Sequence, residues 1–135
     1  MNRISNVLTI KIPNVHDLRG KLAVVEKDGI PFKMQRVYYL YDVPSDSYRG
    51  GHAHKLQESV LIALSGSFEV LVDDGESKKH IMLNKPDKGL YLPTGIWREI
   101  GNFSSGSVCL VIASTEFEED DYIRDYDDFL SSKMG

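Results

Sequence analysis

Apolar and polar residues alternate over short stretches along most of this chain. Residues 7–12 (VLTIKI) alternate in this way before Pro13, and residues 36–41 (RVYYLY) add many aromatic and β-branched side chains. An alternation with a period of two predicts a β-strand with one buried face. Comparable stretches, separated by turn residues, cover residues 21–26, 59–64, 67–72, 80–83, 89–92, 96–100 and 108–113. Many short strands with turns at intervals of roughly ten residues predict an all-β sandwich or barrel.

The last part of the chain follows a different period. Between residues 122 and 130 the apolar side chains recur at the spacing of one face of an α-helix. Acidic residues gather near the start of this stretch, where the helix dipole favours negative charge. We therefore expect a short C-terminal helix that covers one end of the barrel.

Length and composition narrow the class of protein. A chain of 135 residues predicts one domain, spanning residues 1–135. The net charge of −4 argues against a nucleic-acid-binding protein, which would need a basic face. The single cysteine, Cys109, excludes a disulfide within the chain. No stretch has the length and hydrophobicity of a signal peptide or a membrane span, so we expect a soluble, cytoplasmic protein without a membrane partner.

A pair of histidines gives the first indication of chemistry. His52 and His54 are separated by one residue, so on a strand both imidazoles project to the same face. Glu58 follows four positions after His54. Two imidazoles and a carboxylate in this pattern suit either a metal site or an acid/base site. The spacing alone does not decide between these two sites.

This region resembles the first sequence motif of the cupin superfamily of small jelly-roll barrels. That motif is a glycine, His-x-His, a glutamate and a later glycine, and its counterparts here are Gly51, His52, His54, Glu58 and Gly66. The second cupin motif has as its counterparts Gly89, Pro93, Gly95 and Asn102. At the position of the second-motif histidine this chain has Arg98. The resemblance implies a single-domain cupin-type jelly-roll β-barrel.

Arg98 bears on the choice between metal and acid/base chemistry. In metal-binding cupins the two histidines, the glutamate and the second-motif histidine are the ligands. A guanidinium stays protonated and has no lone pair to offer a metal. We therefore predict no metal and no cofactor, an ion pair between Glu58 and a basic residue such as Arg98, and histidines that are free for proton transfer. Three remaining ligands can still hold a catalytic metal, so a metal-dependent cupin enzyme stays an alternative.

A longer series of motifs is similar to the nucleotide-sugar 3,4-ketoisomerases. The matching segments are RVYYLYD, RGGHAHK, LVDDG, GLYLPTGIWREIGNFS and YIRDYDDF, in this order along the chain. The resemblance implies a metal-independent isomerase, assembled as a homodimer, that converts dTDP-4-keto-6-deoxyglucose to the dTDP-linked 3-keto-6-deoxy sugar. In that family the product is then aminated to a 3-amino-3,6-dideoxy sugar.

The reaction that the resemblance implies can be matched to individual residues. Moving a ketone from C4 to C3 requires a base for the C3 proton, an enediol and reprotonation at C4, with no redox cofactor. Histidine titrates near neutral pH and suits both proton transfers. By resemblance, His52 is the catalytic base, and His54 is the second acid/base group or a proton carrier between the two oxygens. Tyr38 corresponds to a tyrosine near the reacting sugar, where a phenol can donate a hydrogen bond to the enediolate.

The diphosphate of such a substrate needs cations. Alternation along residues 36–41 puts Arg36 on the same strand face as Tyr38, and arginine geometry favours phosphate contacts. The other candidates for substrate binding are Arg19, Arg49 and Arg98, with Trp97 or a tyrosine stacking on the thymine ring. Ion pairs for the arginines and a core position for Trp97 are the competing interpretations.

Two further functions are compatible with the same residues. A related sugar epimerase would exchange the same acidic protons of the sugar but invert the configuration at a carbon atom. A carbohydrate-sensing cupin would bind the nucleotide sugar without turnover. The sequence leaves the C4 stereochemistry of the product and the downstream pathway open.

Overall fold

The structure, a computed structural model, describes residues 1–134, so Gly135, the last residue of the predicted domain, lies outside it. Its strands are β1 (Leu8–Lys11), β2 (Asn14–Asp17), β3 (Gly20–Ala23), β4 (Arg36–Tyr41), β5 (Arg49–His54), β6 (Ser59–Ser65), β7 (Phe68–Asp73), β8 (Lys78–Leu83), β9 (Lys88–Leu92), β10 (Trp97–Gly101), β11 (Val108–Ala113) and β12 (Tyr122–Ile123). The helical elements are the 3-10 turns η1 (Ile4–Asn6), η2 (Lys27–Gly29) and η3 (Glu119–Asp121), and the α-helix α1 (Tyr126–Met134).

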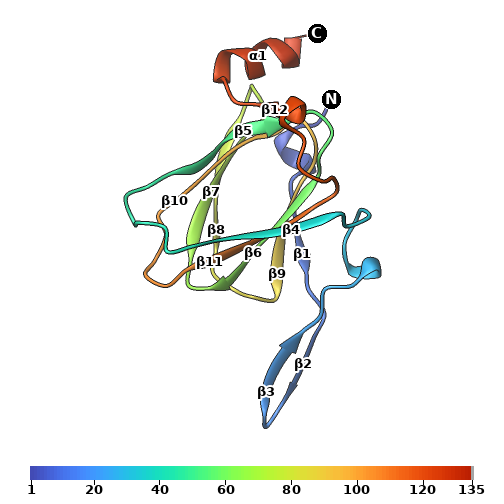
Figure 1. Cartoon of the computed structure of the whole chain (residues 1–135), viewed down its shortest axis with the longest axis vertical. Coiled ribbons are helices and arrows are strands. Elements are labelled where there is room, and N and C mark those ends of the chain that lie inside the picture. Colours follow the sequence, from blue (N-terminus) through green and yellow to red (C-terminus); the bar gives the residue numbers. More distant parts are fainter. Residues whose placement is uncertain (135) are drawn as a thin grey trace.

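Two five-stranded sheets face each other and enclose the main core (Figure 1). One sheet has the strand order β1-β9-β6-β11-β4 and the other has the order β12-β5-β10-β7-β8. Apolar side chains from both sheets fill the space between them, among them Leu61, Phe68, Val70, Leu90 and Val111. The prediction of an all-β fold with two layers or a barrel and a short C-terminal helix is confirmed.

Strand β4 shows how alternation in the sequence becomes a difference between two faces. Its residues alternate between half-buried and exposed, so Tyr38 and Leu40 pack on the core while Tyr39 and Tyr41 face outward. Strand β6 differs because both of its faces are covered: Leu61 points into the main core, and its neighbours pack in a second cluster with the segment before β4. This difference follows from the period-two geometry of a strand.

The C-terminal segment is where the expected secondary structure is wrong. Residues 122–130 were expected to form one helix, but Tyr122 and Ile123 form β12, which pairs antiparallel with β5 next to His54 and Ala53. Helix α1 begins only at Tyr126. Pairing with a neighbouring strand overrides the local helical period, because propensity is only a weak determinant of structure.

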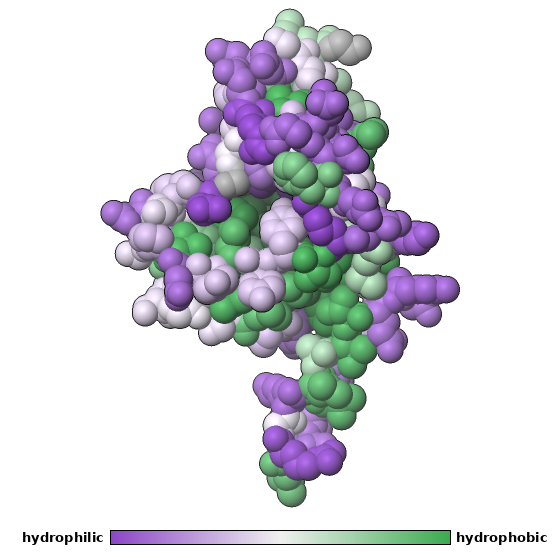
Figure 2. Space-filling model, in the orientation of Figure 1, coloured by the Kyte–Doolittle hydropathy of each residue, from purple (hydrophilic) through white to green (hydrophobic). Residues whose placement is uncertain are grey.

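Strands β2 and β3 form a hairpin arm that projects from the body of the molecule (Figure 1). Every residue of the two strands is exposed, including the apolar Val15 and Leu22. Leu18, in the turn that joins the strands, is fully exposed as well. Figure 2 shows hydrophobic residues on the arm and on the part of the body from which it emerges. Within residues 1–134, no helix has the length and apolar character that crossing a bilayer requires.

Candidate active site

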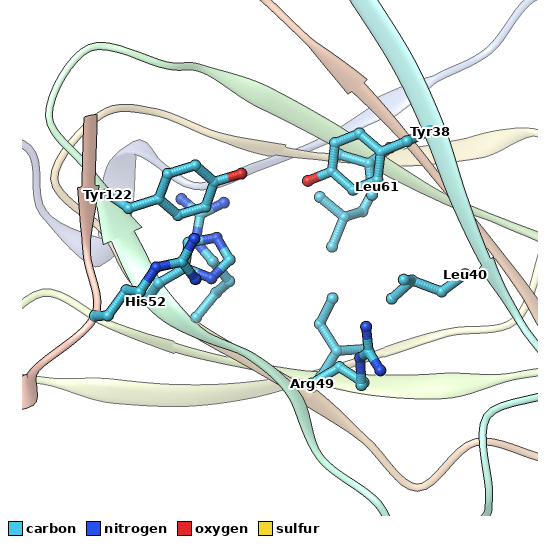
Figure 3. Close-up of a pocket in the computed structure, with 10 residues that line it drawn as sticks. Tyr38, Leu40, Arg49, His52, Leu61 and Tyr122 are labelled. Atoms are coloured by element: carbon cyan, nitrogen blue, oxygen red, sulfur yellow. The ribbon is translucent and has the colours of Figure 1, made fainter. Parts of the chain in front are cut away.

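A cavity of about 210 Å³ lies between the two sheets (Figure 3). Its lining combines aliphatic residues from the core with aromatic and basic side chains, and consists of Tyr38, Leu40, Arg49, His52, Leu61, Arg98, Ile100, Val111, Tyr122 and Arg124. Pockets that enclose a drug-sized ligand usually measure about 300–1,000 Å³. This cavity is smaller than that range, so it can enclose only a part of a ligand of that size.

Pairing between β5 and β10 brings the central histidine and arginine together. His52 lies opposite Arg98 in the register of the two antiparallel strands, and both side chains line the cavity. Residues of the same strands that point the other way, Ala53 and Trp97, pack against Phe129 of α1 on the outer side of this sheet. Because side chains alternate between the two faces of a strand, one face of this sheet lines the cavity and the other face packs against α1.

His54 lies behind His52 and is fully buried. The two imidazole rings meet edge to face, with their centroids 4.7 Å apart. The Nδ1 atom of His54 lies 2.8 Å from a carboxylate oxygen of Asp121. The backbone N–H groups of Leu56 and Gln57 donate to the same carboxylate at 2.6 and 3.2 Å.

Asp121 fixes the proton on His54. The carboxylate of Asp121 accepts two backbone N–H groups, and the imidazole nitrogen that faces the same carboxylate acts as a further donor. Nδ1 therefore carries the hydrogen, and Nε2 is left as a lone pair, buried and without a hydrogen-bond partner in residues 1–134. The side chain of His54 is not among the residues that line the cavity of His52. Its role as the second acid/base group, or as a proton carrier between the two oxygens, stays a prediction.

Burial and positive charge keep both histidines neutral. Desolvation, followed by the charges of Arg98, His54 and Arg124, lowers the pKa of His52 to about 2. Desolvation and Arg98 lower the pKa of His54 to about 4, against the opposing effect of Asp121. Burial lowers the pKa of Arg98 only to about 10, so this residue remains a cation at neutral pH. At pH 7 the cavity therefore has uncharged imidazoles next to a guanidinium.

These pKa values predict that stability falls on acidification. The unfolded chain takes up a proton on each histidine near pH 6.5, whereas the folded chain does so only at much lower pH. The unfolded state then binds more protons, so each histidine costs about 1–2 kcal/mol of unfolding free energy between pH 7 and pH 5. Urea unfolding at both pH values measures this loss.

His52→Asn provides the control for this prediction. The variant removes one titrating group, so its loss of stability between pH 7 and pH 5 should be smaller than that of the wild type. An equal loss in both proteins would show that His52 is not held neutral by its surroundings.

Tyr38 lies on the opposite sheet, and its ring is held by a neighbouring arginine. Arg36 on the same strand lies 4.8 Å from the centroid of the Tyr38 ring, and it donates to the Gln57 side chain at 2.9 Å. Arg36 does not line the cavity itself. Burial raises the pKa of the Tyr38 phenol, so the hydroxyl is protonated and can donate a hydrogen bond.

The structure places three further residues from the sequence analysis away from the cavity of this chain. Glu58 is on the outer side of its sheet, where it accepts a hydrogen bond from Tyr91 and makes no ion pair with Arg98. Trp97 is in the cluster with Phe129 instead of the cavity. It precedes Arg98 directly on β10, so the two side chains point to opposite sides of the strand. Arg19 lies at the tip of the arm with a side chain that is 90% exposed, far from its own chain's cavity, and pairs with Asp17.

The cupin metal ligands do not come together in this chain. Glu58 points away from the histidines, and Arg98 occupies the position of the fourth ligand. Among residues 1–134 there is no group of three histidine, cysteine, aspartate or glutamate side chains with the geometry to hold a metal ion. The residues present therefore do not fit the cupin metal site.

Among the aromatic and basic residues that line the cavity, Tyr122 and Arg124 were not predicted as site residues from the sequence. Tyr122 in β12 packs its ring against His52 and His54, with centroid distances of 5.0 and 4.4 Å. The guanidinium of Arg124 lies 4.2 Å from the centre of the Tyr122 ring and pairs with Glu119. Both residues had been placed in the expected C-terminal helix. The signal that could have found them is the segment YIRDYDDF, which contains both and is similar to the ketoisomerases.

Comparisons with known proteins agree with this geometry. The family FdtA, described as WxcM-like, C-terminal, matches residues 5–134. The TDP-4-oxo-6-deoxy-alpha-D-glucose-3,4-oxoisomerase of Aneurinibacillus thermoaerophilus is 44% identical over 121 residues, covering 89% of this chain and 87% of that protein. The sugar 3,4-ketoisomerase QdtA from Thermoanaerobacterium thermosaccharolyticum, in complex with TDP, is 41% identical, with a TM-score of 0.95 over 98% of this chain and 97% of QdtA. A 3,4-ketoisomerase from Helicobacter canadensis is 43% identical, with a TM-score of 0.93 over 96% of this chain and 98% of that one.

Proposed function

We propose that this chain, which belongs to the FdtA (WxcM-like, C-terminal) family, is an isomerase that moves the ketone of dTDP-4-keto-6-deoxyglucose from C4 to C3. The observation that carries the proposal is the neutral imidazole of His52, which faces a cavity lined by tyrosines and by Arg98. The relatives that share 41–44% of the sequence are named for the same ketone transfer. The reaction needs proton carriers and a cation, and the cavity offers both.

His52 acts on the two carbons. Its neutral imidazole takes the proton from C3, the C–H electron pair forms the C3–C4 double bond, and the carbonyl electrons move to the C4 oxygen. The imidazolium then returns its proton to C4, which completes the ketone at C3. A base with a strongly lowered pKa is weak. Desolvation lowers the pKa of His52 most, and an anionic substrate beside Arg98 and Arg124 offsets the charges of these two arginines, which lower it further.

The enediolate intermediate is stabilised by groups that are already in place. Tyr38 donates a hydrogen bond to a sugar oxygen from one sheet, and Arg98 supplies positive charge from the other. Arg98 is almost completely buried and donates to the carbonyl of Ile96 at 3.1 and 3.2 Å, which fixes its position. Fixed charges in a dry site stabilise a developing oxyanion more than mobile charges in water do.

The diphosphate lies at the mouth of the cavity in this proposal. Arg49 and Arg124 both line the cavity, and a guanidinium can contact two phosphate oxygens at once. Arg36 supports Tyr38 and contributes positive charge near the site without lining it. Arg19 can reach a diphosphate only if it belongs to a second copy of the chain, because the arm carries it away from its own cavity (Figure 1).

The arm supports assembly as a homodimer. A two-stranded hairpin is marginally stable by itself, and this one exposes Val15, Leu18 and Leu22. The outer face of β4 is also exposed and apolar, with Tyr39 and Tyr41 side by side at a ring distance of 5.9 Å. Docking of the arm on a second copy would bury these surfaces and bring Arg19 towards the partner's cavity.

Substitutions in the arm test this assembly. Leu18→Asp combined with Leu22→Asp should convert a dimer into a monomer in sedimentation velocity experiments, because both changes place charge in the proposed interface. Arg19→Ala should keep the dimer and raise the KM for the nucleotide sugar. A wild type that is monomeric, or an arm variant that stays dimeric, would contradict the proposed assembly.

Product analysis tests the function itself. Purified protein is incubated with dTDP-4-keto-6-deoxyglucose, and NMR of the sugar is expected to show a 3-keto product whose C5 configuration is unchanged. Inversion at C3 or C5 would identify an epimerase, and binding without conversion would identify a sensing protein.

Elemental analysis of the active protein tests the alternative of a metal-dependent enzyme. Stoichiometric metal whose removal abolishes turnover would contradict acid/base catalysis without a metal.

The later steps follow from the chemistry of the product. A ketone at C3 is the functional group that an aminotransferase converts to an amine, so amination to a 3-amino-3,6-dideoxy sugar is the proposed next reaction. Cytoplasmic localisation and a single domain over residues 1–135 remain predictions from the sequence.

A further inference from the structure

Gln57 is a buried polar residue that contacts both sides of the candidate active site. It lies in the connection between β5 and β6 and is only 1% exposed. Its backbone N–H donates at 3.2 Å to the Asp121 carboxylate, which also binds Nδ1 of His54. Its side-chain oxygen accepts a hydrogen bond from Arg36 at 2.9 Å. One residue is therefore bonded to the partner of His54 and to the arginine beside Tyr38.

The side-chain amide of Gln57 is fixed by three partners. Arginine can only donate a hydrogen bond, so the amide oxygen is the atom that faces Arg36. The hydroxyl of Thr115 donates to the same oxygen at 3.2 Å, and the amide nitrogen donates to the hydroxyl of Ser59 at 2.9 Å. Because both ends of the buried amide are paired, the side chain is held in one orientation.

Arg36 depends on Gln57 for its position. Within residues 1–134 the guanidinium makes this one hydrogen bond, and its Nε atom is buried without a partner. The same guanidinium lies 4.8 Å from the centre of the Tyr38 ring and 5.6 Å from the centre of the Phe117 ring. Arg36 is only half-buried, so a guanidinium that loses its one acceptor is free to move from the Tyr38 ring into water.

We propose that Gln57 is a positioning residue for Tyr38 that acts through Arg36, a role that rests on the proposed ketoisomerase function. The Tyr38 hydroxyl points into the cavity (Figure 3), where it meets the sugar oxygen on which negative charge develops. A displacement of such a group by about 1 Å can lower a rate by about 10²-fold.

The charge of Arg36 adds an electrostatic reason to hold it in place. Burial raises the pKa of the Tyr38 phenol most, and the positive charges of Arg98 and Arg36 oppose this rise. A phenol whose pKa is kept lower is a stronger hydrogen-bond donor to an enediolate oxygen. Gln57 therefore supports both the position of Tyr38 and its strength as a donor.

Gln57→Leu tests this role, because it removes the amide and keeps the backbone N–H that binds Asp121. We expect kcat for ketone transfer to fall by about 10–10²-fold while the KM for the nucleotide sugar changes little, since Arg49 and Arg124 are untouched. In a Tyr38→Phe background, the same substitution should lower kcat by less than about twofold, because residues that act as a unit have non-additive effects. Gln57→Glu keeps an oxygen for Arg36 and should restore most of the wild-type kcat.

Gln35→Leu is the matched control. Gln35 precedes Arg36 directly and is exposed, so the same change there should leave kcat and KM unchanged. Thermal unfolding of each variant reports whether it folds. If Gln57→Leu does not fold, Arg36→Met at its half-buried position takes its place in both backgrounds, with the same expected loss and the same non-additivity.

Two results would overturn the assignment of Gln57. An unchanged kcat in Gln57→Leu would show that Tyr38 does not depend on this residue. An equal loss of kcat in the wild-type and Tyr38→Phe backgrounds would show that Gln57 acts on the fold or on another group. Wild-type protein measured in parallel identifies failure of the proposed function, because an inactive wild type contradicts the ketoisomerase itself and not only the role of Gln57.

Discussion

His52→Asn is expected to lower the turnover number by about 10²–10⁴-fold, the range that a general acid/base group contributes. Asparagine fills a similar space and keeps a polar side chain opposite Arg98, but it cannot accept the C3 proton. The variant should still bind thymidine diphosphate with nearly wild-type affinity, because the arginines at the mouth of the cavity are unchanged. Steady-state kinetics and titration calorimetry measure the two quantities.

His80→Asn is the matched control for this substitution. His80 is on the outer strand β8 with an exposed side chain near Glu69, so its replacement should leave turnover unchanged. A His52→Asn protein with normal turnover would remove His52 from the reaction. Loss of thymidine diphosphate binding together with turnover would make His52 a ligand-holding residue instead of a base.

Phe129→Ala is expected to lower the unfolding free energy by about 3–5 kcal/mol, as truncations of buried phenylalanine do. Phe129 is fully buried and packs α1 against Ala53 and Trp97, with its ring 5.7 Å from the indole. Helix α1 follows directly on the segment that carries Tyr122 and Arg124 into the cavity. The substitution should therefore also weaken the placement of these two residues and lower turnover.

Met134→Ala in the same helix provides the comparison. Met134 is 88% exposed, so its truncation should change the unfolding free energy by less than about 0.5 kcal/mol. Urea unfolding of the three proteins measures the difference. If Phe129→Ala is no less stable than Met134→Ala, helix α1 does not hold this side of the barrel.

The sequence predicted the parts of the site that follow from local periodicity. His52 and Tyr38 lie in strands whose alternation is visible in the sequence, and both strands form with the expected faces inward. The same rule could have separated Arg98 from Trp97, since adjacent residues of one strand point to opposite sides. Trp97 was still kept as a candidate for stacking, and the structure places it under α1.

The residues that sequence reasoning missed depend on contacts between distant segments. Asp121 pairs with His54 across 67 positions of the chain, and Tyr122 reaches the cavity only because β12 pairs with β5. Both residues lie in an acidic stretch whose spacing resembles a helix. Glu58 was wrongly expected beside the histidines because its position matches the cupin motif. The turn between β5 and β6 changes which side of the sheet the following residues face, so the carboxylate of Glu58 lies outside the barrel.

The central claim is tested most directly by the position of deuterium after reaction of the wild-type protein with dTDP-4-keto-6-deoxyglucose in deuterium oxide. Proton transfer by His52 between C3 and C4, with exchange of the imidazolium proton for solvent deuterium, predicts deuterium at C4 of a 3-keto product and at C3 of recovered substrate, with none at C5. Deuterium at C5, or the absence of both deuterium uptake and a 3-keto product, would contradict this account.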